Sequence, residues 1–288
     1  MTNVAVLTDS CASIPEELLE RLHIRTVAYY IHRGGEVLRD LVTIQRDEFL
    51  HWLPTARVVP TTACPGPGDY YDAYKQLAEE GIDEIISIHM TSKASGAYQA
   101  ATIAQAKIKE EYPNLQIEVV DTQNASLCQG WMVIEAARAA LAGLSLDRIT
   151  ALVKKMIPLT RMIQTADTLK YLYLGGRIGK AQQLVGSMLN IKPLIGMVEG
   201  VIVPLGKTHS RGQAYQKMAE MVAETVGRSR VKIAYVHAGA LKEVEKIKEL
   251  VESKVEVVES FFAELSPALA VHTGPGTAGV CYFPVSEE

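Results

Sequence analysis

The sequence predicts an α/β protein with two domains, of which the first is built on a mostly parallel sheet. Short apolar runs alternate with helical patterns through the first half of the chain, which is typical of crossover units on a parallel sheet. The second half has more strands, including a pair joined by a turn at Glu199-Gly200. Pro158 interrupts a helical pattern between the halves, so we place the boundary between residues 1–157 and 158–288.

Each predicted strand of the first half is a short run of apolar or β-branched residues, and each predicted helix has an apolar face with a cap or a glycine stop. The strands are expected at residues 4–7, 25–32, 84–90 and 117–120. The helices are expected at residues 13–22, 46–53, 69–80, 95–111 and 128–141. These helices would flank the sheet.

The second half is expected to form an α/β domain with a mixed sheet. Its strands are predicted at residues 161–165, within 191–205 (two strands), and at 231–237, 255–265 and 277–285. Helices are predicted at 215–226 and 241–254, and the second of these is amphipathic and strongly charged.

Composition excludes several classes of function. The net charge of −4 leaves no basic excess to neutralise phosphates, so a nucleic-acid partner is not expected. The four cysteines form no CxxC pair, which disfavours a metal site and fits reduced thiols in a cytoplasmic protein. The sequence shows neither a signal peptide nor an apolar run of the roughly 20 residues needed for a transmembrane helix. We expect a monomer.

Three loops at predicted strand ends carry hydroxyl groups, at residues 8–10, 61–66 and 91–96. Open α/β sheets bind ligands beyond the carboxyl ends of their strands. Ser95 is a natural N-cap, and the backbone N–H groups that follow it would attract an anion. The alternative is that these hydroxyls only cap helices and turns, and for either loop alone that alternative is the better one.

The sequence contains no recognisable catalytic motif of the HExxH, GxSxG or calcium-loop type. Nothing close to Cys64 would activate its thiol. His89 lies in an apolar strand and is predicted to be a core histidine with its hydrogen bonds satisfied. The pair Gly175-Gly176 is followed by Arg177 and lacks the spacing of a nucleotide-binding fingerprint.

Seven segments in order along the chain resemble the DegV family of bacterial fatty-acid-binding proteins. They are VAVLTDS at 4–10, PTTACP at 60–65, TSKASGAYQAA at 91–101, VDT at 120–122, LYLGGRI at 172–178, IKPL at 191–194 and HTGPG at 272–276. Each segment alone is a weak signal, but the ordered set covers the whole chain and is specific. The resemblance implies two α/β domains with an acyl chain buried near their junction.

The resemblance also implies that loop hydroxyl groups hold the carboxylate of the fatty acid. This role falls to Thr62 and Ser95, with support from Thr61, Ser92, the N–H of Gly96 and His272 near the head group. Three residues depart from the family pattern, because Ala63 replaces a serine, Cys64 a glutamine and Ala97 a threonine. The loss of a hydroxyl at position 63 changes the number of head-group hydrogen bonds that we can expect.

A partner is implied as well, because proteins of this family present the carboxylate to a fatty acid kinase that forms an acyl phosphate. Arg211 stands at the position of the family's kinase-linked arginine. For Arg177, docking and a solvated surface position are equally good interpretations. Arginine suits a phosphate product because it can bind it through two parallel hydrogen bonds.

The acyl tunnel is expected to use apolar residues near the matching motifs. The candidates are Ile163, Leu184, Met188, Leu189, Ile195 and Phe262, although ordinary core packing would use the same residues. A chain of about 16 carbons offers about 0.8 kcal/mol for each buried CH₂, so the tail supplies ample gross affinity. Such a carrier needs no cofactor other than the bound fatty acid.

The competing hypothesis is an enzyme, a small-molecule hydrolase or phosphotransferase that uses the same strand-end loops. Its candidate residues are Cys64, His272 and Asp9. We expect a carrier and not an enzyme, because the sequence shows no activated nucleophile.

Overall fold

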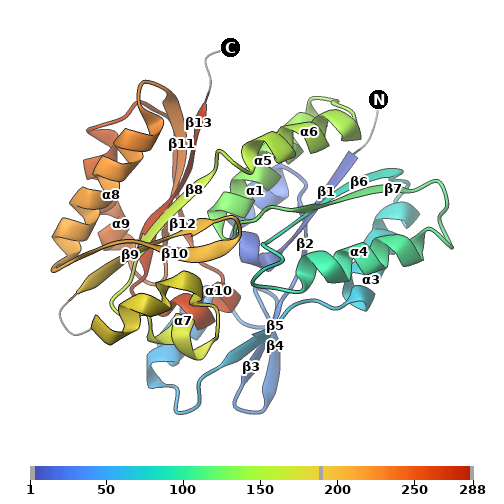
Figure 1. Ribbon diagram of the computed structural model, residues 1–288. Coiled ribbons are helices and arrows are strands. Elements are labelled where there is room, and N and C mark those ends of the chain that lie inside the picture. The colour runs from blue at the N-terminus through green and yellow to red at the C-terminus, as the bar shows by residue number, and fades with distance from the viewer. Residues whose placement is uncertain (1–3, 188–190, 286–288) are drawn as a thin grey trace.

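The computed structural model describes residues 4–187 and 191–285 and contains three β-sheets. In Figure 1 the parallel sheet of the first half lies on the right and the large sheet of the second half on the left, with a small sheet below them. Two residues predicted for the acyl tunnel, Met188 and Leu189, lie outside the described residues.

A four-stranded parallel sheet occupies the centre of the first half, in the order β2-β1-β6-β7. Its strands are β1 (Val4–Asp9), β2 (Arg25–Val27), β6 (Glu84–His89) and β7 (Gln116–Asp121). Both faces of β6 are covered, so Ile85, Ile86 and Ile88 are all fully buried. The mostly parallel sheet predicted from the sequence is confirmed.

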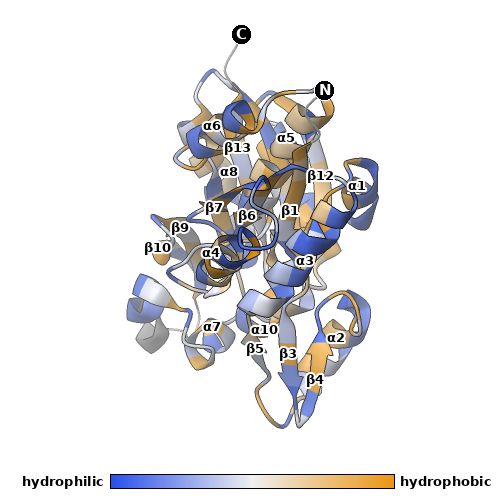
Figure 2. Ribbon diagram, turned by 90° about the vertical axis from the view of Figure 1, so that its right-hand side faces the viewer, coloured by the Kyte–Doolittle hydropathy of each residue, from blue (hydrophilic) through white to orange (hydrophobic). Residues whose placement is uncertain are grey.

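Helices cover this sheet on two sides. The first half contains α1 (Glu16–Arg21), α3 (Pro67–Glu79), α4 (Ala97–Ile108), α5 (Leu127–Leu141) and α6 (Leu146–Met156). Helices α3 and α4 pack together on one side, and α5 and α6 on the other (Figure 1). Hydrophilic residues lie along the outer side of α3, whereas the strands behind it are hydrophobic (Figure 2).

The small sheet is antiparallel and was not predicted. It pairs β4 (Glu36–Arg39), β3 (Tyr30–Arg33) and β5 (Thr61–Ala63), in that order. The single strand expected at 25–32 is therefore two strands, β2 and β3, in different sheets. Helix α2 (Arg46–Trp52) and the 3₁₀ turn η2 (Leu53–Thr55) lie between β4 and β5 along the chain.

The second half forms a six-stranded mixed sheet in the order β10-β9-β8-β13-β11-β12. Its strands are β8 (Arg161–Thr165), β9 (Lys192–Val198), β10 (Val201–Thr208), β11 (Arg230–His237), β12 (Val257–Glu264) and β13 (Ala278–Val285). Only the pair β11–β12 is parallel among these described strands. The mixed sheet and the β9–β10 turn at Glu199-Gly200 are confirmed.

Helices α8 (Arg211–Val226) and α9 (Leu241–Glu252) cover one face of the mixed sheet. The other short elements of this half are α7 (Lys170–Leu174), η3 (Gly179–Ser187) and α10 (Pro267–Thr273). No helix is predicted between the strands at 255–265 and 277–285, but residues 267–273 form α10. Ser266 caps this helix by accepting a hydrogen bond from the N–H of Leu269, and Pro267 occupies the first turn.

The largest core cluster runs through both halves of the chain. Trp131 of α5 is fully buried, packs on Phe261 and Phe283, and donates a hydrogen bond of 3.0 Å from Nε1 to the carbonyl of Cys281. Helix α5 therefore lies between the parallel sheet and the mixed sheet. The boundary at 157/158 follows the order of the elements and stays a prediction, because the apolar packing crosses it.

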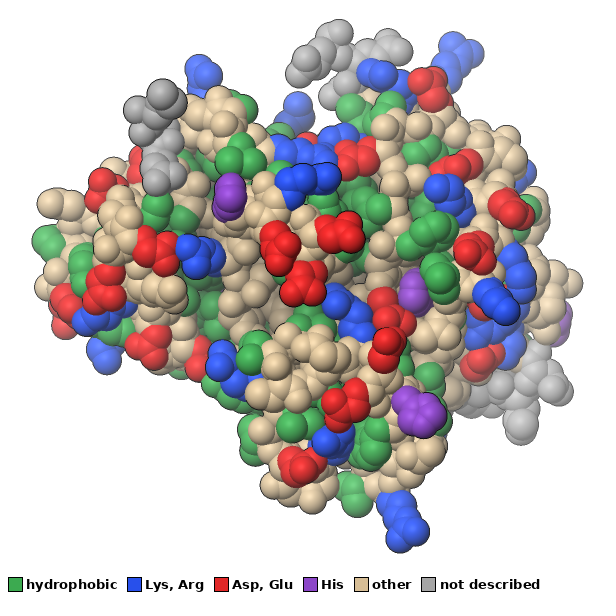
Figure 3. Space-filling view, turned by 180° about the vertical axis from the view of Figure 1, so that it is seen from behind, with side chains coloured by type: hydrophobic (Ala, Val, Ile, Leu, Met, Phe, Trp, Pro, Cys, Tyr) green, Lys and Arg blue, Asp and Glu red, His purple; other side chains and the backbone are tan. Residues whose placement is uncertain are grey.

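Acidic and basic side chains are interspersed on the face seen in Figure 3, without one continuous basic area. Within residues 4–187 and 191–285, no helix has both the length and the apolar character required to cross a membrane. In the same ranges, no cluster of three or more His, Cys, Asp or Glu side chains is arranged to hold a metal ion.

Candidate functional site

A cavity of about 60 Å³, which we call the head-group pocket, lies where α10 meets the loops of the first half. It is lined by Cys11, Tyr29, Thr62, Cys64, Met90, Ala94, Ser95, Gly96, Arg177, Ala268, Leu269 and His272. These residues come from both halves of the chain, including the 3₁₀ turn η1 (Ser10–Ala12), β5, the start of α4 and α10. The pocket is therefore a product of tertiary packing.

Ser95 forms one polar wall of the pocket. It was predicted as the N-cap of α4, but that helix begins at Ala97 and its N-cap is Gly96. The Oγ of Ser95 is 2.6 Å from the hydroxyl of Tyr29 and accepts a hydrogen bond of 3.2 Å from the N–H of Ala97. Burial raises the pKa of Tyr29 well above its ordinary value, so its phenol stays protonated and can donate to Ser95. Ser95 then keeps its own hydrogen for a ligand.

Thr62 and His272 form a second polar wall. Thr62 Oγ1 lies 2.8 Å from Nε2 of His272, whereas the buried Nδ1 has no hydrogen-bond partner among the described residues. Burial, together with the nearby charge of Arg177, lowers the pKa of His272 to about 4. The imidazole is therefore neutral at pH 7.

Arg177 is the cationic side chain among the residues that line the pocket. It follows the Gly175-Gly176 turn after α7, and its guanidinium donates to two carbonyls. Nη1 lies 2.8 Å from the oxygen of Gly175, and Nε lies 3.4 Å from that of Ala94. Arg177 thus places a positive charge at the edge of the pocket, next to the start of α4.

The structure brings five of the eight predicted polar site residues together, namely Thr62, Ser95, Gly96, His272 and Arg177. Thr61 and Ser92 are exposed and do not line the head-group pocket. Thr61 pairs with His32 across the small sheet, so its side chain projects from the face opposite to that of Thr62. The N–H of Ser92 donates to Asp121.

Arg211 lies outside the pocket and has specific partners. Its guanidinium bonds both carboxylate oxygens of Asp167, the hydroxyl of Tyr215 and the carbonyl of Gly276. The pKa of Asp167 falls to about 2, mainly because of the hydrogen bond from Arg211. Arg211 is the first residue of α8, and it ties that helix to the loop that follows α10.

The apolar candidates separate into two groups. Leu184 and Ile195 belong to a small cluster between η3 and the sheet, which we call the α7–η3 cluster, with Leu169, Leu172, Ile178, Ala181 and Ile202. Ile163 and Phe262 instead lie in the core under α8 and α9. Side chains alternate between the faces of a strand, so their neighbours Met162 and Phe261 point toward the junction.

Sequence reasoning missed Tyr29, Cys11, Met90, Ala268 and Leu269 as pocket residues. Cys11 and Met90 follow strand ends, and that position was a usable signal. Tyr29 lies between β2 and β3 and carries no motif, so only the tertiary fold brings it to Ser95.

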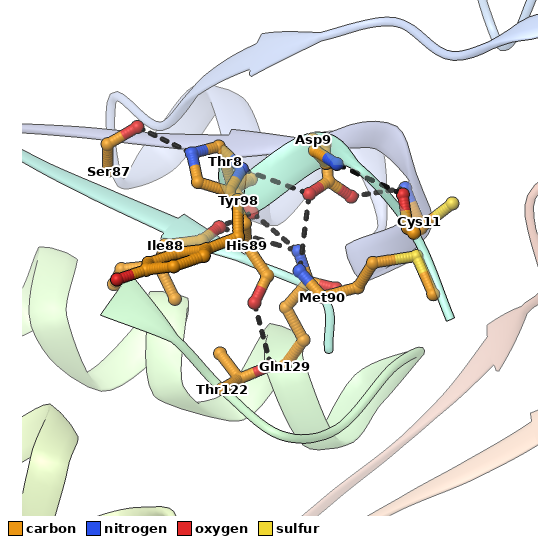
Figure 4. A network of polar contacts seen from close by, with 12 residues as sticks. Thr8, Asp9, Cys11, Ser87, Ile88, His89, Met90, Tyr98, Thr122 and Gln129 are labelled. Carbon is orange, nitrogen blue, oxygen red and sulfur yellow. Dashed lines mark hydrogen bonds and ion pairs between the residues drawn. The ribbon is translucent and has the colours of Figure 1, made fainter. Parts of the chain in front are cut away.

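A buried polar network adjoins the pocket at Cys11 and Met90 (Figure 4). Asp9 Oδ2 lies 3.1 Å from Nδ1 of His89, and Oδ1 accepts a hydrogen bond from the N–H of Cys11. Nε2 of His89 lies 2.6 Å from Ser87 Oγ, and all of these side chains are fully buried except Cys11, which is 2% exposed. His89 is therefore a core histidine with satisfied hydrogen bonds, as predicted.

This network also bears on the enzyme hypothesis. Cys64 and His272 do line the same pocket, but Asp9 does not and is paired with His89 instead. The three residues of the competing hypothesis are thus not assembled around one cavity.

Comparison with known proteins gives matches over nearly the whole chain. A family model described as "Uncharacterised protein, DegV family" matches residues 3–285. A DegV domain-containing protein of Caldanaerobacter subterraneus is 30% identical over 98% of this chain and 99% of its own. One from Streptomyces coelicolor is 33% identical over 96% of this chain and 97% of its own.

Solved structures agree with this fold. A DegV family protein from Thermus thermophilus, described by its fatty acid binding, has a TM-score of 0.91 and 31% identity. The match covers 98% of this chain and 100% of that one. DegV of Bacillus subtilis, described as a fatty acid binding protein, has a TM-score of 0.87 and 28% identity, with coverage of 99% and 100%. The chain therefore belongs to the DegV family.

Proposed function

We propose that this protein binds a long-chain fatty acid and holds its carboxylate in the head-group pocket. The observation that carries the proposal is that two hydrogen-bonded pairs, the hydroxyls of Tyr29 and Ser95 and the hydroxyl of Thr62 with the imidazole of His272, line one small cavity. The T. thermophilus and B. subtilis proteins, both described as fatty acid binding, share the fold along the whole chain.

The head group would be held mainly by neutral donors. Ser95 has a free hydrogen when Tyr29 donates to it, and Thr62 has one when His272 carries its proton on Nε2 and donates to Thr62. Arg177 adds a positive charge at the edge of the pocket. Several charge-assisted hydrogen bonds of this kind offset the cost of removing a carboxylate from water.

The acyl chain needs an apolar path, and the α7–η3 cluster supplies the nearest candidate. Ile178 of this cluster follows Arg177, which lines the head-group pocket. We place the tail between η3 and strand β9, against Leu184 and Ile195. Each CH₂ buried there contributes about 0.8 kcal/mol of gross affinity.

We further propose that the bound carboxylate is presented to a fatty acid kinase, which converts it to an acyl phosphate. Arg177 is exposed at the edge of the pocket and suits contact with the new phosphate. In this scheme the protein acts in the cytoplasm as a monomeric carrier, without a catalytic step of its own.

The central test is extraction of the purified protein with organic solvent, followed by mass spectrometry. We expect close to one fatty acid per chain in the wild type. The Thr62→Ala/Ser95→Ala variant should lose it, since each lost bond to a charged group costs about 1.5–3 kcal/mol. The matched control is Thr61→Ala/Ser92→Ala, which removes the same groups outside the pocket and should retain the ligand. Equal retention by both variants would refute the site.

A protein that is empty and turns over acyl or phosphoryl substrates would support the enzyme hypothesis instead. In that case Cys64→Ala should abolish turnover.

The presentation step is tested with added kinase and ATP. Arg211→Ala is expected to keep its fatty acid but to give less acyl phosphate. Asp167→Ala separates two explanations, because it frees Arg211 without removing its charge. If Asp167→Ala gives the same defect, Arg211 acts by holding the loop at Gly276; normal phosphorylation in both variants would show that Arg211 plays no part in docking.

A further inference from the structure

Helices α7 and α10 are each followed by a glycine that packs closely against the other helix. A methyl group built on Gly175 would overlap Nδ1 of His272 and lie 3.0 Å from its Cε1. On the other side, a methyl group on Gly274 would overlap the ring of Tyr171 and lie 2.7 Å from its Cε2. The glycine after α7 thus faces a ring of α10, and the glycine after α10 faces a ring of α7.

The two glycines are required for different reasons. Gly274 has φ +77°, a backbone conformation that favours glycine in any surroundings. Gly175 has φ −75° and ψ −6°, which every L-residue adopts without strain. Position 175 therefore needs a glycine for space alone. The overlap is with the imidazole of His272, and the carbonyl oxygen of Tyr171 is the next atom, at 3.1 Å.

The contact accounts for the place of the ring. Nδ1 faces Gly175 and has no hydrogen-bond partner among the described residues, so no polar contact holds that edge. The ring is fixed by the Gly175 surface on one side and by the bond of 2.8 Å from Nε2 to Thr62 on the other. A ring pushed away from Gly175 loses its alignment with Thr62.

We propose that Gly175 is a positioning residue, which seats the His272 imidazole against Thr62 and so builds one wall of the head-group pocket. The proposal rests on the proposed fatty-acid binding for its functional consequence, but the seating itself is a property of the protein alone. Arg177, two residues further along the same turn, adds the charge that faces the ring. The turn at 175–177 thus supplies both the glycine surface against which the imidazole packs and the positive charge near it.

The test begins with Gly175→Ala. The backbone tolerates alanine, so the fold should persist, while the ring must shift. A displaced ring would no longer orient Thr62, which would lose its hydrogen bond to the carboxylate of the fatty acid. We expect fatty acid affinity to fall on the order of tenfold, the effect of one such bond to a charged group. Gly68→Ala is the matched control, since Gly68 lies in helix α3 with no atom within 4 Å of the added methyl group. Its affinity should equal that of the wild type.

The same substitution made in a His272→Ala protein tests whether Gly175 acts through His272. If Gly175 acts by seating the ring, Gly175→Ala should have no further effect in a His272→Ala protein, where the overlap is removed and only the carbonyl oxygen of Tyr171, at 3.1 Å, stays close to the added carbon. The same double variant restores folding if the single variant fails through the clash. An equal loss in both backgrounds would overturn the proposal.

A readout that does not depend on ligand is the titration of His272 followed by its Cε1–H signal in NMR. The other titratable groups that line the pocket are Arg177, Tyr29, Cys11 and Cys64. Displacement of the ring toward solvent should move its midpoint from about 4 toward the ordinary 6.5 in Gly175→Ala. An unchanged midpoint would contradict the seating. A wild-type protein without fatty acid would count against the proposed function, while this titration would still decide the role of Gly175.

Discussion

Arg211 and Asp167 form a two-point ion pair, with Nε 3.1 Å from Oδ1 and Nη2 2.7 Å from Oδ2. Nη2 also donates a hydrogen bond of 2.8 Å to the carbonyl of Gly276. One guanidinium therefore joins the start of α8, the segment after β8 and the loop after α10. The ion pair therefore fixes the loop at Gly276 outside the head-group pocket.

We expect Arg211→Ala and Asp167→Ala each to lower the free energy of unfolding by about 1–3 kcal/mol at pH 7. The double variant should lose less than the sum, because the two residues share one interaction. Urea unfolding of the four proteins measures this. Lys217→Ala is the control, because Nζ of Lys217 forms an exposed ion pair of 3.7 Å with Oε2 of Glu220. It should lower the free energy of unfolding by less than about 0.5 kcal/mol. Strict additivity would mean that the ion pair contributes nothing.

His272 should make the ligand-free protein less stable in mild acid. Its pKa is lowered from 6.5 to about 4, mainly by burial, so the unfolded chain takes up a proton before the folded one does. The free energy of unfolding should therefore fall as the pH decreases from about 6.5 to about 4, by up to about 3 kcal/mol. Denaturant unfolding across this range should show a shallower slope in His272→Gln. Parallel curves would argue against a buried neutral histidine.

Asp40 should have the opposite effect on the pH dependence of stability, over nearly the same range of pH. It is fully buried, accepts a hydrogen bond from the N–H of Ala268, and burial raises its pKa from 3.8 to about 6. Its contribution to stability is thus present below about pH 4 and is lost as the pH rises through 6. Asp40→Asn keeps the acceptor without the charge. We expect the variant to gain stability relative to wild type between pH 4 and pH 8, measured by urea unfolding; a constant difference would be inconsistent with this.

Trp131 should be the largest single contributor to the packing between the two halves. It is fully buried against Phe261 and Phe283 and bonds the carbonyl of Cys281. Trp131→Ala is expected to cost about 3–5 kcal/mol in the free energy of unfolding. Trp52→Ala removes the other tryptophan, in an only partly buried place, and should cost less. A larger loss in Trp52→Ala would show that packing between the two halves contributes less to the free energy of unfolding than packing around Trp52.

Most of the fold was predictable because its parallel strands are continuous apolar runs with local end signals. The small sheet was not, because β3, β4 and β5 have only three or four residues each and β5 pairs with a strand about 30 residues away. Helix α10 had a usable signal in Ser266-Pro267, a cap followed by proline. Gly274 and Gly276 follow directly after this helix of only seven residues, so the sequence signal for it is short.

The site was predictable in part for a similar reason. Thr62 and Ser95 stand in motifs, but Thr61 and Ser92 look equally suitable in the sequence. The register of β5 against β3 decides between Thr61 and Thr62, and that register is a tertiary property. The same alternation along β8 and β12 sends Ile163 and Phe262 away from the junction.

The network in Figure 4 has a consequence for assigning hydrolases by geometry. Ser87, His89 and Asp9 stand in the order of a charge-relay system, with Ser87 Oγ 2.6 Å from one ring nitrogen and Asp9 3.1 Å from the other. All three side chains are fully buried, so no ester or amide can reach the hydroxyl. The order of these three side chains is therefore not by itself evidence for a serine hydrolase. Solvent access to the nucleophile, together with an oxyanion site beside it, is what separates such an enzyme from a structural hydrogen-bond chain.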